Sequence, residues 1–172
     1  MSIKRLRTAY ERFLEALVML LMAVLAAEVV AGVIFRTIGR PLVWYDEIAS
    51  VLLAWLTYYG AALAAIKRAH IGFPGLAAAL NPEWRVALLV LAEALVLAFF
   101  SLLAWVGYSV LDVLATDFLV SLPAVSVRYT QSVIPISSLL FIIAELLVFP
   151  ELLRQARGRA VIAENLAAEV TH

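Results

Sequence analysis

The sequence contains no cysteine and only two histidines, His70 and His172. Without thiols the chain forms neither a disulfide nor a cysteine-based metal or redox site. Two histidines at these positions do not build a bis-histidine haem site inside a membrane. We therefore expect no metal and no cofactor.

An excess of charge and the common catalytic motifs are also missing. The 13 basic and 13 acidic residues give a net charge of zero, whereas nucleic-acid binding usually needs a basic surface. The sequence has no Ser/His/Asp arrangement and none of the patterns HExxH, GxGxxG or GxxxxGK(S/T). We predict a protein that is not an enzyme and does not bind nucleic acid.

Four long apolar runs dominate the chain, at about 13–35, 48–66, 86–111 and 129–149. Hydrophobic residues make up 65% of the sequence and the mean hydropathy is +1.01. A membrane-spanning helix needs roughly 20 apolar residues, so each run is about long enough to cross a bilayer. The sequence therefore predicts an all-α membrane protein, one integral membrane domain over 1–172 with four transmembrane helices, short interfacial helices and a tail at 151–172. The first run is too long for the core of a signal peptide, so we expect an uncleaved span.

The distribution of Lys and Arg predicts the orientation of these helices. Basic residues are enriched in cytoplasmic loops, and ten of the thirteen lie in the N-terminal tail, the second loop and the C-terminal tail. The first and third loops carry only Arg36, Arg40 and Arg128. Both termini should be cytoplasmic, and the first and third loops should lie at the outer face.

The first loop ends in a group of aromatic and acidic residues. Trp44 is typical of a membrane-interface anchor, and Asp46 and Glu47 open the second span, where carboxylates meet the positive end of the helix dipole. We expect both acids to lie within reach of Arg36 and Arg40. The simplest interpretation of this group is a capped and anchored helix start.

Two glutamates, Glu28 and Glu93, lie inside apolar runs. A charged side chain at mid-bilayer costs roughly 3 kcal/mol on insertion scales, so each should be neutral, paired or turned toward another protein. A proton-coupled carrier would use Glu28 to exchange protons with its substrate. We interpret both glutamates instead as structural acids at helix–helix contacts.

Small residues and prolines shape the second and fourth spans. Gly60 stands among alanines on a surface that allows close helix packing. Tyr129 anchors the start of the fourth span, and Pro135 predicts a kink in its first turns. The tail from Glu151 to Val170 is expected to form a helix on the membrane or on a partner, interrupted at Gly158.

Several of these residues, taken in chain order, resemble a known family. The pattern is Trp44-x-Asp46-Glu47, then Gly60-Ala61, Lys67-Arg68-x-His70-Ile71, Tyr129 and Pro135-Ile136. It resembles the small membrane subunit, or Q subunit, of tripartite ATP-independent periplasmic (TRAP) transporters. The resemblance covers about residues 10–150, including the four-span layout.

The resemblance implies a function in the inner membrane of a bacterium. Such transporters take up organic acids with a sodium gradient, using a periplasmic substrate-binding protein and a large membrane subunit that holds the substrate and sodium sites. The small subunit enlarges the scaffold of the large one, helps to dock the binding protein and has no substrate site of its own. The residues named above are then partner-interface or structural candidates, and membrane lipids are further partners.

Two other readings of the residues stay open. One is a self-contained four-helix, proton-coupled carrier of small molecules that uses Glu28. The other is an assembly subunit of a different membrane complex.

Overall fold

The computed structural model describes residues 3–69 and 82–170. Four long helices are present: α1 (Ile3–Thr37), α2 (Tyr45–Lys67), α4 (Pro82–Val113) and α6 (Val133–Val170). A 3-10 turn, η1 (Leu114–Thr116), and the short helix α5 (Val127–Gln131) join α4 to α6. All four long helices include segments long and apolar enough to span a membrane, which confirms the prediction of an all-α membrane protein. His70 and the turns expected in the second loop lie outside the described residues.

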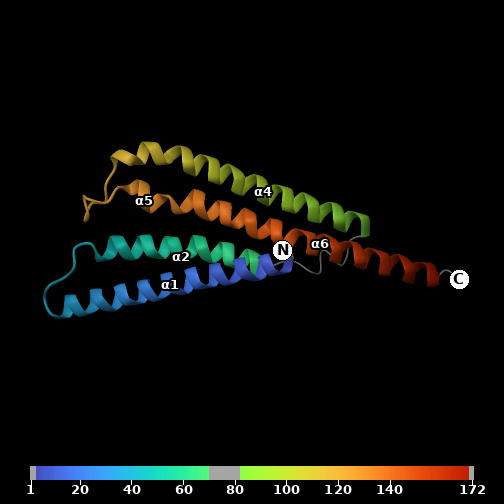
Figure 1. Ribbon diagram of the computed structural model, residues 1–172, viewed down its shortest axis with the longest axis horizontal. Helices are drawn as coiled ribbons and strands as arrows, with labels where there is room; N and C mark the ends of the chain where they lie inside the picture. Colours follow the sequence, from blue (N-terminus) through green and yellow to red (C-terminus); the bar gives the residue numbers. More distant parts are fainter. Residues whose placement is uncertain (1–2, 70–81, 171–172) are drawn as a thin grey trace.

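The four long helices form a row rather than a square bundle. Figure 1 shows the order α1, α2, α6, α4 across the molecule, and the packing between helices follows the same order. Helices α2 and α6 occupy the centre, while α1 and α4 form the two edges. One end of the row carries the α1–α2 and α4–α5 connections, and we call it the loop end. The opposite end holds the first turns of α1 and the last turn of α2, and we call it the basic end.

Two apolar clusters hold the centre of the row together. The cluster nearer the basic end joins Leu14 of α1, Ile66 of α2 and Val148 of α6, with buried alanines between them. Ala62 and Ala65 are small enough for α1 to reach α6 across the end of α2, as expected of small residues between membrane helices. The other cluster contains Leu21, Tyr59 and Val133.

Helices α4 and α6 pack closely along much of their length. The rings of Phe100 and Phe141 stack, with centroids 3.7 Å apart. Nearer the loop end, a Cβ added to Gly107 would lie 2.9 Å from Cγ2 of Ile134 and 3.2 Å from Cδ of Pro135. The absence of a side chain at Gly107 therefore sets how closely the two helices approach.

The fourth apolar run forms two helices, the short α5 and the long α6, and α6 extends far beyond the end of the run. The backbone leaves α5 at Gln131 and enters α6 at Val133, so Pro135 stands in the first turn of α6, where a missing N–H is tolerated. The indole N–H of Trp55 donates to the carbonyl of Thr130 beside this break at 2.8 Å. The single residue between the two helices is Ser132, three residues before Pro135.

The tail differs from the sequence-based expectation. Helix α6 runs without interruption from Val133 to Val170, through Pro150 and Gly158. A glycine inside a helix costs only about 1 kcal/mol relative to alanine, which is too little to end a helix among the good helix formers around it. The tail is thus the continuation of α6 and not a separate helix interrupted at Gly158.

Candidate functional site

Glu47 ties the start of α2 to the connection between α4 and α5. Its carboxylate accepts hydrogen bonds from the backbone N–H groups of Val120, at 3.0 Å, and Ser121, at 2.8 Å, and from the Ser121 hydroxyl. The sequence predicted that this acid would serve the N-terminus of its own helix. The structure instead gives it amides from a segment more than seventy residues away.

The partner of Glu47 is a folded loop over residues 117–127. The N–H of Val127 bonds to the carbonyl of Asp117, and the N–H of Leu119 bonds to the carbonyl of Val125, both at 2.9 Å. Leu119 is buried, while the next residue, Val120, is 92% exposed. The loop therefore presents an apolar side chain on a backbone fixed by internal bonds and by Glu47.

Three donors bond to the Glu47 carboxylate, namely the Ser121 hydroxyl and the backbone N–H groups of Ser121 and Val120. Hydrogen bonds to a carboxylate are stronger than hydrogen bonds between neutral groups. One side chain at the start of α2 thus fastens the 117–127 loop.

Asp46 and Arg36 lie on a recess beside this tie. The recess has a volume of about 370 Å³ and is bounded by the last turns of α1, the α1–α2 connection and the start of α2. Among the described residues, no ion pair joins Arg36 or Arg40 to either Asp46 or Glu47. Within the described part of the chain, Asp46 and Arg36 therefore have no ion-pair partner at the loop end.

The wall of the recess is formed by Tyr45, which lies against Gly32. A Cβ added to Gly32 would lie 2.1 Å from Cε2 of Tyr45, so only glycine admits the ring at this distance. Trp44 stands directly before α2 and its carbonyl accepts the Ile48 N–H at 3.0 Å. The close approach at Gly32 fixes where α2 begins and, with it, where Glu47 points.

The other predicted interface residues are spread over the molecule. Tyr129 is exposed on α5, and Pro135 is buried against Gly107 on α4. A Cβ added to Gly60 would meet nothing within 4 Å, so this glycine faces open space. The structure therefore groups Arg36 with Trp44, Asp46 and Glu47 near the start of α2 and leaves Gly60, Tyr129 and Pro135 apart from them.

The two intramembrane glutamates lie on different helices. Glu93 on α4 is buried and Glu28 on α1 is half-buried. In each, the Oε1 atom is buried without a hydrogen-bond partner. A buried polar atom without a hydrogen-bond partner costs free energy, so these two oxygens are notable in both helices.

Interactions at the basic end were not predicted from the sequence. The Tyr10 hydroxyl donates to the carbonyl of Leu140 at 2.6 Å, and Lys67 pairs with Glu15 and, at 4.0 Å, with Glu11. Glu11 and Glu15 lie four residues apart, so they share one face of α1 and could have been predicted to bind a basic side chain. The sequence does not say that this side chain would be Lys67.

Three recesses among the described residues lie near the two ends of the helix row. Residues 3–69 and 82–170 contain no group of three or more acidic or histidine side chains that could hold a metal ion.

Comparison with known proteins identifies one family. Residues 25–155, about three quarters of the chain, match the family model described as "Tripartite ATP-independent periplasmic transporters, DctQ component". No individual curated protein matches the chain.

Proposed function

Because the chain belongs to the family of DctQ components of tripartite ATP-independent periplasmic transporters, we propose that it serves a sodium-driven uptake system for organic acids. It works in the inner membrane of a bacterium, beside a large membrane subunit and a periplasmic substrate-binding protein. The family match over residues 25–155 carries this proposal.

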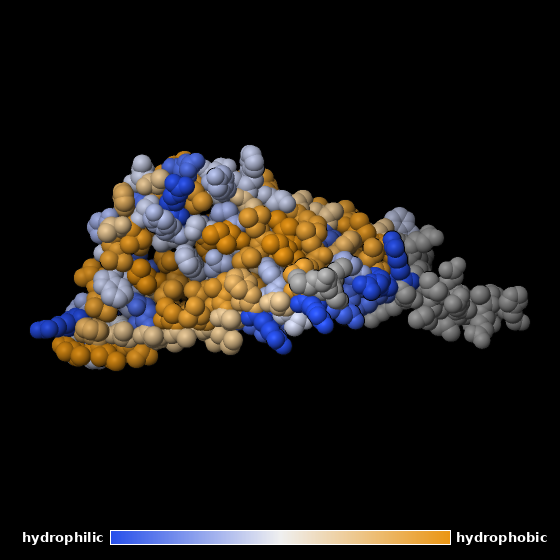
Figure 2. Space-filling view, in the orientation of Figure 1, coloured by the Kyte–Doolittle hydropathy of each residue, from blue (hydrophilic) through white to orange (hydrophobic). Residues whose placement is uncertain are grey.

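The shape of the helix row supports a scaffold role. Large apolar side chains on the two edge helices remain exposed, including Trp105, 75% exposed on α4, and Met19, 61% exposed on α1. Figure 2 shows apolar residues over the middle of the molecule and hydrophilic ones mostly toward its ends. Such a row has ample surface for lipid and for a membrane partner, while the partner supplies the substrate and sodium sites.

The loop end is the proposed contact for the binding protein. The Glu47 tie holds the 117–127 loop against the start of α2, and unpaired Asp46 and Arg36 lie beside it. A surface fixed in advance loses less conformational entropy on docking. Trp44, Arg40 and Tyr129 complete the set of residues that we assign to this end.

Reconstitution tests the proposal directly. The chain alone in liposomes should be silent, and uptake should require a large subunit, a binding protein and a sodium gradient. Substrate flux carried by the purified chain alone would refute the scaffold role.

Gly60 gives a sharper test of contact with the large subunit. Gly60→Leu should leave the isolated chain stable, because an added Cβ meets nothing within 4 Å, yet it should weaken co-purification with the large subunit. Ala98→Leu on the exposed face of α4 is the matched control. Equal recovery of the large subunit with parent, test and control chains would remove Gly60 from the interface.

The buried Oε1 of Glu28 is the one observation that favours the alternative, a proton-coupled carrier. Gln resembles a neutral carboxylic acid in shape and hydrogen bonding but cannot release a proton. In the scaffold, Glu28→Gln should keep both assembly and uptake. A complex that assembles with Glu28→Gln but no longer transports would favour the carrier.

A further inference from the structure

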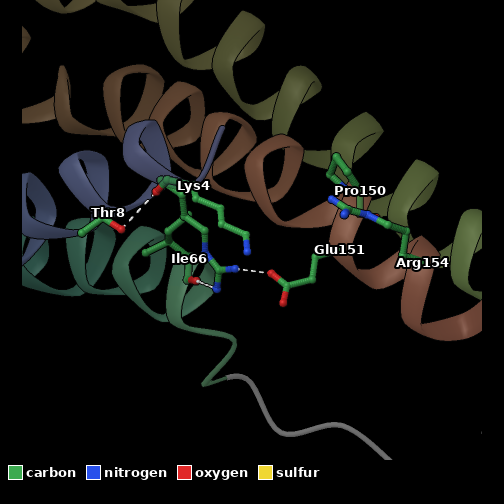
Figure 3. A network of polar contacts seen from close by, with 7 residues as sticks. Lys4, Thr8, Ile66, Pro150, Glu151 and Arg154 are labelled. Carbon is green, nitrogen blue, oxygen red and sulfur yellow. Dashed lines mark hydrogen bonds and ion pairs between the residues drawn. The ribbon is translucent and has the colours of Figure 1, made fainter. Parts of the chain in front are cut away.

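The basic end contains a recess built by two helices that are far apart in the sequence. The first turns of α1 and the part of α6 around Pro150 enclose a volume of about 450 Å³. Among the described residues, its lining holds three cations, Lys4, Arg7 and Arg154, and one acid, Glu151. Figure 3 shows Lys4, Glu151 and Arg154 around this part of the molecule.

One of the three cations is already neutralised and held in place. Arg7 pairs with Glu151 and also donates to the carbonyl of Ile66 at 3.4 Å. This contact joins α1, the end of α2 and α6. Arg7 and Glu151 therefore act as a brace between the helices, and the remaining charge of the recess comes from the other two cations.

Lys4 and Arg154 have no acidic partner within the described residues. The Nε–H of Arg154 donates to the carbonyl of Pro150 at 3.3 Å, which leaves the outer N–H groups of its guanidinium for another acceptor. Both side chains border the same recess. Two cations so placed would bind a group with several anionic oxygens, and a phosphate is the commonest such group in proteins and membranes.

The surroundings of the recess indicate that this phosphate belongs to a lipid. Leu147 and Pro150 form an apolar part of its lining. The recess thus combines cations with apolar side chains of α6 at one end of the helix row. Basic pockets between membrane helices are known to take the headgroups of anionic lipids.

We propose that the recess between α1 and α6 is a binding site for the headgroup of an anionic phospholipid, with Lys4 and Arg154 contacting its phosphate. The Arg7–Glu151 pair holds the two walls at the required separation. The excess of basic residues on one side of a membrane protein explains where these charges lie, but it does not require them to converge on one recess. The site depends on neither the transported substrate nor the identity of the large subunit.

Lipid binding to the full-length chain, purified in a mild detergent, tests the proposal. Native mass spectrometry would measure bound phosphatidylglycerol against bound phosphatidylcholine. The parent chain should retain phosphatidylglycerol selectively, and Lys4→Gln with Arg154→Gln should lower its affinity by roughly tenfold to thirtyfold. Arg5→Gln with Arg12→Gln removes the same charge from a neighbouring recess, which these two residues line together with Lys4, and should have little effect.

Three results would overturn the proposal. The parent chain could bind both lipids equally, or the control pair could lower affinity as much as the recess pair, which would indicate a general surface potential. Inorganic phosphate at millimolar concentration could displace the lipid completely, which would indicate a site for the free anion. Retained selectivity in Lys4→Arg, combined with its loss in the double Gln variant, would support a charge-specific headgroup site.

Discussion

Gly32→Ala should destabilise the start of α2 without touching any charged residue. The added Cβ would lie 2.1 and 2.2 Å from Cε2 and Cδ2 of Tyr45 and 2.9 Å from Cγ. Carbon atoms in contact prefer about 3.5–4.0 Å, so the ring has to move by more than about 1 Å. Because Tyr45 is the first residue of α2, this movement also displaces the helix start that carries Glu47.

The size of the effect follows from two opposing terms. Overpacking of a closely packed site costs about 1–3 kcal/mol, and a contact this short belongs in the upper half of that range. Replacing glycine by alanine inside a helix returns about 1 kcal/mol. The net loss of about 1–2 kcal/mol corresponds to a fall in Tm of about 2–8 °C for a chain of this size.

Thermal unfolding in detergent, followed by tryptophan fluorescence, measures this change. Gly60→Ala is the matched control, because Gly60 is also inside a helix but its added Cβ meets nothing within 4 Å. The control should be neutral or slightly stabilising. Combining Gly32→Ala with Tyr45→Ala should remove the clash, so the two substitutions together should be less harmful than the sum of their separate effects. Equal Tm values for Gly32→Ala and Gly60→Ala would refute the close approach of Tyr45 to Gly32.

Three further predictions concern orientation, the buried acid and the loop tie. Because the chain has no cysteine, single-cysteine variants report topology without background. Val43→Cys should react with an impermeant thiol reagent added outside the cell, and Ala69→Cys should not. Labelling of Ala69→Cys in intact cells would contradict the predicted orientation. Glu93→Gln should change the free energy of unfolding by less than about 1 kcal/mol, because a neutral acid and an amide are alike in shape; a large loss would show that Glu93 is ionised and paired. Glu47→Ala should speed hydrogen exchange at the Ser121 amide while leaving the long helices protected. Unchanged exchange in Glu47→Ala would contradict the tie.

Much of the helix content of this protein follows from its sequence. A run of some twenty apolar residues in a bilayer has to satisfy its own backbone hydrogen bonds, and a helix does so within one segment. The four apolar runs therefore predict α1, α2, α4 and α6. The order of residues in the chain likewise places Trp44, Asp46 and Glu47 where α2 begins.

The arrangement of the helices and the partners of the polar groups required the tertiary structure. The row α1–α2–α6–α4 places Tyr10 beside the carbonyl of Leu140 and Trp55 beside that of Thr130. The local sequence pattern does not say which helix lies next to which, since all four helices have similarly apolar surfaces. Glu47 has a carboxylate suited to any nearby N–H group, and only the folding of residues 117–127 over α2 decides that it bonds to Val120 and Ser121. Apolar runs thus determine the helices one at a time, whereas contacts between residues distant in the sequence determine how they pack and what their polar side chains bind.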